Sequence, residues 1–177
     1  PDGEVDGAVL VLTDVTHTVT TARALDFAAN HDALTGLPNR TLLHERLNLA
    51  LARVQRRGGT FAVLFLDLNR FKHINDNLGH RAGDAVLRII AQRLTGLCRD
   101  TDTVARWGGD EFVLLLEDVD GQEGVAAAAA HVVATLGQDI VLDASFGHLT
   151  LPSAGSVGVV IAPQDGVEPD ALLSKAD

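Results

Sequence analysis

The feature that most constrains this chain is residues 106–112, where two glycines and two acids stand between apolar runs at 103–105 and 113–116. The four residues are Gly108, Gly109, Asp110 and Glu111. Two extended runs joined by a glycine pair predict a β-hairpin. The glycines can adopt positive φ and leave the backbone open to close approach, while the two acids point to opposite faces of a strand. This combination suits a metal-bound phosphate, although Gly-Gly-Asp is equally ordinary turn chemistry.

Composition narrows the class of protein. The 177 residues are 46% hydrophobic and 21% charged, as in a soluble globular domain, and the net charge is −10. An acidic chain binds nucleic acid and anionic membranes poorly, so we expect no nucleic-acid partner. A single cysteine, Cys98, allows no internal disulfide, and no apolar run approaches the ~20 residues of a membrane helix. We expect a cytoplasmic domain cut from a longer protein, which could itself be attached to a membrane.

Hydrophobic periodicity predicts the order of the remaining elements. Helices are expected at 17–30, 40–56, 83–96 and 122–136, and a last helix opens at Pro169. Short strands are expected near 140–142, 147–151 and 155–162. The continuous apolar run 61–66 predicts a strand buried on both faces. This order predicts an α+β fold with the helices packed mainly on one face of the sheet.

Asp67 stands where the apolar run 61–66 stops. A carboxylate at the end of a buried strand is costly unless a cation pairs with it, which makes Asp67 a candidate metal ligand. An N-cap of the next helix explains the same residue without any metal.

Several blocks together resemble the GGDEF family, the diguanylate cyclases. Gly-Gly-Asp-Glu-Phe is the family signature, and the match extends over about residues 31–177. The resembling blocks lie at 32–40, 67–84, 108–112, 156–159 and 172–177. The resemblance implies a fold like that of nucleotidyl cyclases and the polymerase palm, which is ferredoxin-like, with a central antiparallel sheet flanked by helices.

The resemblance also implies an activity: condensation of two GTP molecules into cyclic di-GMP with release of two pyrophosphates, assisted by Mg²⁺ or Mn²⁺. The residues that match the family's metal ligands are Asp67, the carbonyl of Leu68, Asp110 and Glu111. Asp110 matches the acceptor of the hydroxyl proton, Lys72 the phosphate-contacting lysine, and Asn75 and Asp84 the guanine-reading pair. Gly108 and Gly109 let the backbone approach the nucleotide. Asn69 departs from the family's usual aspartate, and a further phosphate-contacting lysine is expected beyond residue 177.

Other implications concern regulation and partners. Arg99 and Asp102 form an Arg-x-x-Asp pattern, which in the family binds the product as a feedback inhibitor, although an ordinary charged loop explains it as well. Catalysis implies a homodimer, with 17–30 as a linker helix that pairs with its counterpart. Residues 1–16 resemble the last strand of a PAS sensor domain, with an extra edge strand as the alternative.

Two other functions remain open from the sequence. The chain could be a catalytically silent GTP-binding module that controls a linked phosphodiesterase domain. It could also be another palm-type nucleotidyl cyclase, although the guanine-reading pair argues against that. The intact Gly-Gly-Asp-Glu-Phe favours catalysis, because a pure sensor could lose its acids freely.

Overall fold

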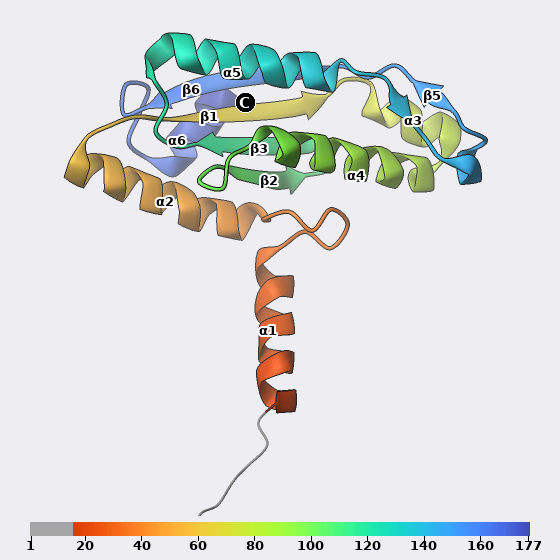
Figure 1. The fold of residues 1–177 in the computed structure, drawn as a ribbon, viewed down its shortest axis with the longest axis horizontal. Helices are drawn as coiled ribbons and strands as arrows, with labels where there is room; N and C mark the ends of the chain where they lie inside the picture. The colour runs from red at the N-terminus through yellow and green to blue at the C-terminus, as the bar shows by residue number, and fades with distance from the viewer. Residues whose placement is uncertain (1–15) are drawn as a thin grey trace, which may run out of the picture.

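Four antiparallel strands form the central sheet in the order β2-β3-β1-β6 (Figure 1). Their bounds are β1 Phe61–Leu68, β2 Thr103–Gly108, β3 Glu111–Leu116 and β6 Gly155–Ala162. The structure is a computed structural model that describes residues 16–177. The central antiparallel sheet confirms the expected fold class, and β2 and β3 form the predicted hairpin. The predicted sensor segment, 1–16, lies essentially outside the described residues.

Side chains of β1 alternate between two hydrophobic cores. Ala62, Leu64 and Leu66 lie in one core, while Phe61, Val63 and Phe65 lie in the other, and each of them is at most 5% exposed. Because successive strand residues point to opposite faces, an apolar run without interruption must be covered on both sides. Burial on both faces, predicted from this run, is therefore confirmed.

Helices cover both faces of the sheet. Helices α3 (Phe71–Leu78), α4 (His80–Leu97) and α5 (Gly121–Leu136) pack on the face that carries Leu64. Helices α2 (Arg40–Arg57) and α6 (Pro169–Ala176) pack on the face that carries Val63. The expectation that the helices lie mainly on one face was wrong, because it overlooked what the two-sided apolar strand requires.

Two short elements were not predicted as they occur. Helix α3 has eight residues and buries only Phe71, too little for hydrophobic periodicity to show. The chain between α5 and β6 forms a small hairpin of β4 (Ile140–Val141) and β5 (Thr150–Leu151), with a 3-10 turn at Ala144–Phe146 between them. The segment from β5 to β6 and helix α3 line opposite sides of one cavity.

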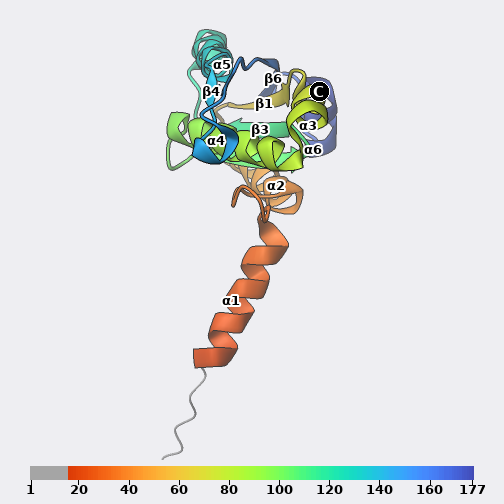
Figure 2. The ribbon, with the colours of Figure 1, turned by 90° about the vertical axis from the view of Figure 1, so that its right-hand side faces the viewer.

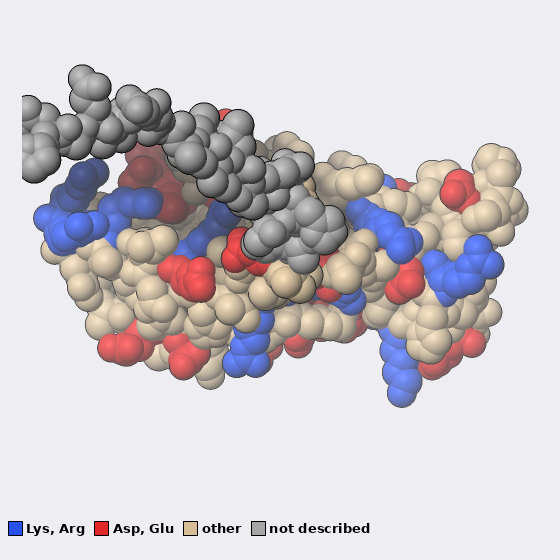
Figure 3. Space-filling view, turned by 90° about the horizontal axis from the view of Figure 1, so that it is seen from below, with Lys and Arg blue, Asp and Glu red and all other residues tan. Residues whose placement is uncertain are grey.

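Helix α1 (Thr16–Asn30) projects away from the rest of the molecule (Figures 1 and 2). Leu25 and Phe27 are 67% and 54% exposed on it. Its end is joined to the start of α2, because the Asn39 amide donates to the Asn30 carbonyl and the Asn39 side chain donates to Ala29. None of the helices within 16–177 has the length and apolar character needed to cross a membrane. Seen from the α1 side, acidic and basic side chains are interspersed (Figure 3).

Candidate active site

Two acids face each other across the central strands. Asp67, near the end of β1, is the register partner of Glu111, the first residue of β3. Directly opposite residues in an antiparallel pair lie on the same face of the sheet, so the two carboxylates are close neighbours. Asp110 precedes Glu111 in the turn between β2 and β3. The fold thus brings together three of the acids that the sequence assigned to a metal site, from positions more than 40 residues apart.

Burial and neighbouring negative charges shift the pKa values of two of these acids. Burial raises the pKa of the Asp67 carboxyl above its ordinary value of 3.8, and the negative charges of Asp110 and Asp177 raise it further. Burial also raises the pKa of Glu111 above its ordinary 4.5, with the charge of Asp177 the next cause. The carboxylates of Asp67, Asp110 and Glu111 accept no hydrogen bond and form no ion pair among the side chains that the structure describes. Like charges held together in this way favour binding of a cation.

The structural alternatives for two of the predicted residues do not hold. Helix α3 takes its N-cap from Arg70, so Asp67 does not cap it. Helix α4 takes its N-cap from Gly79, and Asp84 lies inside the helix. Neither aspartate has another structural partner within residues 16–177 that would account for it. The helix caps that the sequence left open as alternatives therefore account for neither carboxylate.

Helices α3 and α4 bring the predicted guanine-reading pair together. The Asn75 side chain packs directly on Gly83, where an added Cβ would overlap Asn75 Oδ1. Gly83 immediately precedes Asp84, so Asn75 of α3 contacts the turn of α4 that carries Asp84. Lys72, in the first turn of α3, is exposed and has no ion-pair partner within 16–177. A Cβ at position 83 would therefore force the Asn75 side chain to move from its present position.

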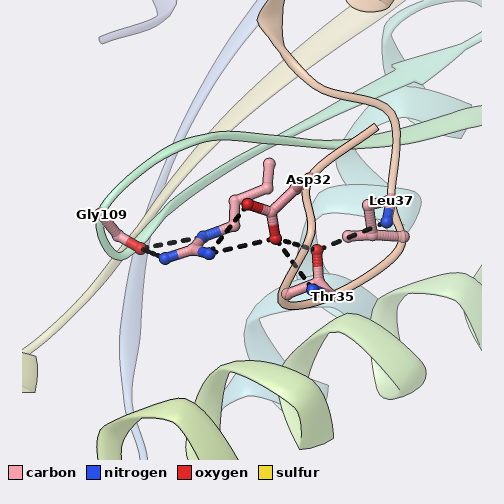
Figure 4. Close-up of polar contacts among 5 residues, drawn as sticks. Asp32, Thr35, Leu37 and Gly109 are labelled. Atoms are coloured by element: carbon pink, nitrogen blue, oxygen red, sulfur yellow. Dashed lines mark hydrogen bonds and ion pairs between the residues drawn. The ribbon is translucent and has the colours of Figure 1, made fainter. Parts of the chain in front are cut away.

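The turn between β2 and β3 is held by Arg106 of β2, which also pairs with Asp32 outside the hairpin (Figure 4). Gly109 has φ +46°, in the left-handed region that suits glycine. Its carbonyl accepts from Arg106 Nη2 at 2.6 Å and from Nε at 3.1 Å. Arg106 Nη1 also lies 3.0 Å and 3.1 Å from the two carboxylate oxygens of Asp32. The side chain of Arg106 therefore connects the turn to the loop that follows α1.

The Asp32 carboxylate also accepts hydrogen bonds from its own loop. Its Oδ1 accepts from the backbone amide of Thr35 at 2.9 Å and from the Thr35 hydroxyl at 2.7 Å. Burial raises the pKa of Asp32, but the hydrogen bonds from Thr35 and Arg106 outweigh that effect and lower it below 3.8. Sequence reasoning did not assign Arg106 a role. The available signal was an arginine two residues before the glycine pair, together with an Asp-x-x-Thr turn.

Trp107 anchors the other side of the same turn. The Arg40 guanidinium lies 4.2 Å from the centre of its ring, a cation–π contact. The Phe65 ring approaches it edge-on, with centroids 6.1 Å apart. Gly108 and Gly109 remain exposed, with no atom within 4 Å of a Cβ built on either. The backbone of the turn is thus held in place by its neighbours and remains open to a ligand.

Asn69, the departure from the family pattern, has a structural partner. Its side-chain Oδ1 accepts a hydrogen bond from Ser156 Oγ at 3.1 Å, and its backbone amide donates to the Ala154 carbonyl at 2.9 Å. Asn69 therefore joins the end of β1 to the start of β6. Because it is an asparagine, Asp67 is the single acid among residues 67–69.

Arg99 and Asp102 lie away from the acids, at the opposite end of β2 from the turn. Asp102 accepts from the backbone amide of Arg99 at 2.9 Å and from that of Glu117 at 3.1 Å. Both residues line a cavity of about 160 Å³, and the Arg99 side chain is exposed. A carboxylate can accept about four hydrogen bonds, so Asp102 retains capacity for a ligand.

The donor set fits a magnesium or manganese ion only in part. The acids and the Leu68 carbonyl are the oxygen ligands these ions prefer. No group of three or more His, Cys, Asp or Glu side chains within 16–177 is arranged to hold a metal ion unaided. Magnesium commonly binds through one or two carboxylates together with substrate phosphates. The geometry therefore suits ions that arrive with a phosphorylated ligand.

Comparisons with known proteins identify related chains. Residues 29–177 match the family model described as diguanylate cyclase, GGDEF domain. Diguanylate cyclase TpbB of Pseudomonas aeruginosa is 42% identical over 154 residues, which cover 87% of this chain and 35% of that protein. Cyclic di-GMP phosphodiesterase NbdA of the same organism is 40% identical over 148 residues, covering 84% of this chain and 18% of that protein. The chain thus spans about a third or less of these relatives.

A solved structure shares the fold. The crystal structure of the GGDEF domain of TpbB superposes with a TM-score of 0.77 at 40% identity, over 81% of this chain and 87% of that one. The mixed helix and sheet architecture with a central antiparallel sheet is common to both.

Proposed function

Because this chain belongs to the GGDEF family of diguanylate cyclase domains, we propose that it condenses two GTP molecules into cyclic di-GMP and two pyrophosphates. The observation that carries the proposal is the pairing of Asp67 with Glu111 across β1 and β3, beside Asp110, with no protein cation to neutralise them within 16–177. Such a cluster is costly to the fold unless it binds cations. It also explains how a chain of net charge −10 accepts a triphosphate.

In the proposed reaction, the 3′-hydroxyl of each nucleotide attacks the α-phosphate of the other. A new P–O ester bond forms, the bond between the α- and β-phosphates breaks, and pyrophosphate leaves. Asp67, the Leu68 carbonyl, Asp110 and Glu111 would hold Mg²⁺ or Mn²⁺, which supplies charge neutralisation to the phosphates. Asp110 accepts the hydroxyl proton, and its lack of a hydrogen-bond partner within 16–177 leaves it free to do so.

Binding of the nucleotide is divided between the turn and the two helices. Lys72 places a positive charge beside the phosphates, where charge develops in the transition state. The open backbone at Gly108 and Gly109 permits close approach. Asn75 and Asp84 recognise guanine, because a carboxylate accepts from the N1–H and the exocyclic amine of that base. Adenine lacks this pair of donors, so the site disfavours ATP.

We propose that the active unit is a homodimer. Each chain has one apparent GTP site, whereas the product joins two nucleotides, so two sites must face each other. Helix α1 is the proposed dimer contact, since Leu25 and Phe27 are 67% and 54% exposed on it. In the parent protein, a sensor domain before α1 would act through this helix.

A second candidate follows from the relative NbdA, which is named as a phosphodiesterase and is 40% identical to this chain. In this alternative the chain binds GTP without turnover and regulates a linked phosphodiesterase domain. The same residues bind nucleotide in both cases. The two functions therefore differ only in whether product forms.

One experiment separates these functions. The chain is incubated with GTP and Mg²⁺, and the products are resolved by chromatography, while GTP binding is measured in parallel by calorimetry. Cyclic di-GMP formation that is lost in Asp110→Asn supports the cyclase. Saturable GTP binding without product, at protein concentrations high enough for dimers, would instead support the regulatory module. An absence of both binding and turnover contradicts both.

A further inference from the structure

A cavity of about 690 Å³ lies between helix α3 and the segment 149–154. None of the residues proposed for GTP, metal or product binding lines it. Its apolar wall consists of Ile74, Leu78, Leu149, Leu151, Pro152 and Ala154. Small-molecule sites typically enclose about 300–1,000 Å³ and are mostly apolar with a few polar groups. The cavity has the size and the lining of such a site.

One face of helix α3 lines this cavity, and other residues of the same helix belong to the proposed GTP site. Arg70, just before the helix, and residues 73, 74, 77 and 78 line the cavity. Positions three and four apart lie on one face of a helix, so these residues form a single stripe. Lys72 and Asn75 lie off that stripe, and Asn75 packs instead on Gly83 of α4. One short helix thus contributes to two separate binding surfaces.

The ionisable residues that line the cavity favour an anionic ligand. The chain holds 24 acidic residues against 14 lysines and arginines, yet no Asp or Glu lines this cavity. Arg70 and His73 are its ionisable members. The Arg70 side chain is exposed and has no hydrogen-bond or ion-pair partner in the part of the chain that the structure describes. An unpaired guanidinium above an apolar wall complements a ligand with one anionic group and an apolar body.

We propose that this cavity is a second, regulatory ligand site for a small amphipathic anion. The apolar body packs between α3 and 149–154, and the carboxylate, sulfonate or phosphate group pairs with Arg70. His73 adds a polar ring at the rim. The ligand binds without any covalent change, and its binding does not require GTP turnover.

The two walls of the cavity meet at the end of β1. The backbone amide of Asn69 donates to the Ala154 carbonyl at 2.9 Å, and Ser156 Oγ donates to Asn69 Oδ1 at 3.1 Å. Asn69 follows Asp67 and Leu68 directly. A ligand that bridges α3 and 149–154 holds these contacts closed and so restrains the end of β1. Occupancy of the cavity is thereby linked to the position of Asp67.

The test uses 8-anilinonaphthalene-1-sulfonate, which combines an aromatic body with one sulfonate, and the whole 177-residue chain. Its fluorescence should rise with saturable, one-site binding. Arg70→Gln should weaken the affinity about three- to tenfold, whereas Arg88→Gln, the same change at an exposed position of α4 away from the cavity, should leave it unchanged. Ser153→Asp should weaken binding from the opposite wall, and Thr150→Asp, on the same segment but outside the lining, should not.

Two further measurements identify the role of the charge and the location of the probe. Uncharged N-phenyl-1-naphthylamine should bind the wild type and Arg70→Gln equally. Amide NMR shifts caused by the sulfonate probe should concentrate at 68–78 and 149–154. Equal affinity of the probe for all four variants and the wild type would overturn the proposal. Shifts that instead cluster at Leu25 and Phe27 would overturn it too, because they would place the probe on the exposed side of α1.

Discussion

Arg106 and Asp32, 74 positions apart in the sequence, form a part-buried two-oxygen ion pair between β2 and the loop after α1 (Figure 4). Their side chains are only 14% and 24% exposed. The same guanidinium also donates twice to the Gly109 carbonyl. A displacement of α1 therefore reaches the proposed active-site turn through one side chain.

Removing this connection should lower activity more than stability explains. Arg106→Gln leaves Gly109 and Asp32 without their shared partner, and small misplacements of reacting groups are costly. We expect kcat to fall about tenfold or more. Arg93→Gln is the matched control, because Arg93 also donates to two backbone carbonyls, those of Gln138 and Asp139, but away from the site. Similar losses of activity in both variants at equal thermal stability would contradict the role of Arg106.

Asp110→Asn should abolish turnover while preserving the fold. The change removes both a metal ligand and the proton acceptor but keeps the size of the side chain. Losses of at least about 10²-fold are typical when transition-state electrostatics of this kind are removed. Asp139→Asn, an exposed aspartate far from the turn, serves as the control in the same chromatographic assay. A folded Asp110→Asn protein with near-normal rates would remove Asp110 from the mechanism.

Stability without divalent ions should increase as the pH falls from 7 toward the ordinary carboxyl range. Asp67 and Glu111 have raised pKa values in the folded state, so their charged forms destabilise it. The penalty is complete above the folded pKa values and absent below the unfolded ones, near 3.8 and 4.5. Melting temperatures of wild type and Asp67→Asn should therefore converge on acidification, with the variant more stable at pH 7.

Saturating Mg²⁺ together with a non-hydrolysable GTP analogue should reverse that difference at pH 7, because bound cations relieve the repulsion in the wild type. A difference that does not vary with pH would show that the acids do not interact as described.

Arg99→Ala should relieve product inhibition with little change in the initial rate. The backbone amide of Arg99 still donates to Asp102 in the variant, so the loop keeps its hydrogen bond while the guanidinium is lost. Titration of cyclic di-GMP into wild type, Arg99→Ala and Arg57→Ala measures the effect. Arg57 is an exposed arginine at the end of α2 and should behave as wild type. Equal inhibition of all three proteins would exclude Arg99 from regulation.

Leu25→Glu should weaken the proposed dimer and reduce specific activity in dilute solution. Leu25 is 67% exposed on α1, so burying a charge there penalises pairing of two helices but does not disturb the domain. Leu49→Glu makes the same change at a position of α2 that is 62% exposed. Specific activity of the wild type that stays constant on dilution below the dimer dissociation constant argues against a dimeric enzyme.

Patterns in the sequence predicted most of the fold because its elements carry strong local signals. Pro169 does begin α6, and the strand at 155–162 has the expected bounds. The hairpin at 103–116 follows from two apolar runs and a glycine pair. Helix α3 escaped prediction because it buries only Phe71 and is capped by Arg70 with φ +61°, without a capping side chain.

The candidate site residues could be proposed from the sequence, but the contacts between them could not. Asp67 and Glu111 each stood out locally, yet their opposition depends on the register of β1 against β3, which tertiary packing sets. The pair formed by Arg106 and Asp32 spans 74 positions, and no local pattern specifies such a contact. The ligand cavity beside α3 likewise forms only when the segment 149–154 folds back against it.

Because β1 lies between β3 and β6, the two sides of the proposed site should differ in how readily their backbone opens to solvent. Amide hydrogens in the middle of β1 are enclosed by strands on both sides and by helices on both faces, so they should exchange with solvent only when the whole domain unfolds. Gly108 and Gly109 lie in an exposed turn, and their amides should exchange orders of magnitude faster. Asp67 thus lies at the end of a strand whose middle should exchange slowly, whereas Asp110 lies in a turn that should exchange fast. One side of the site acts as a fixed reference, and the other can adjust to the nucleotide it meets.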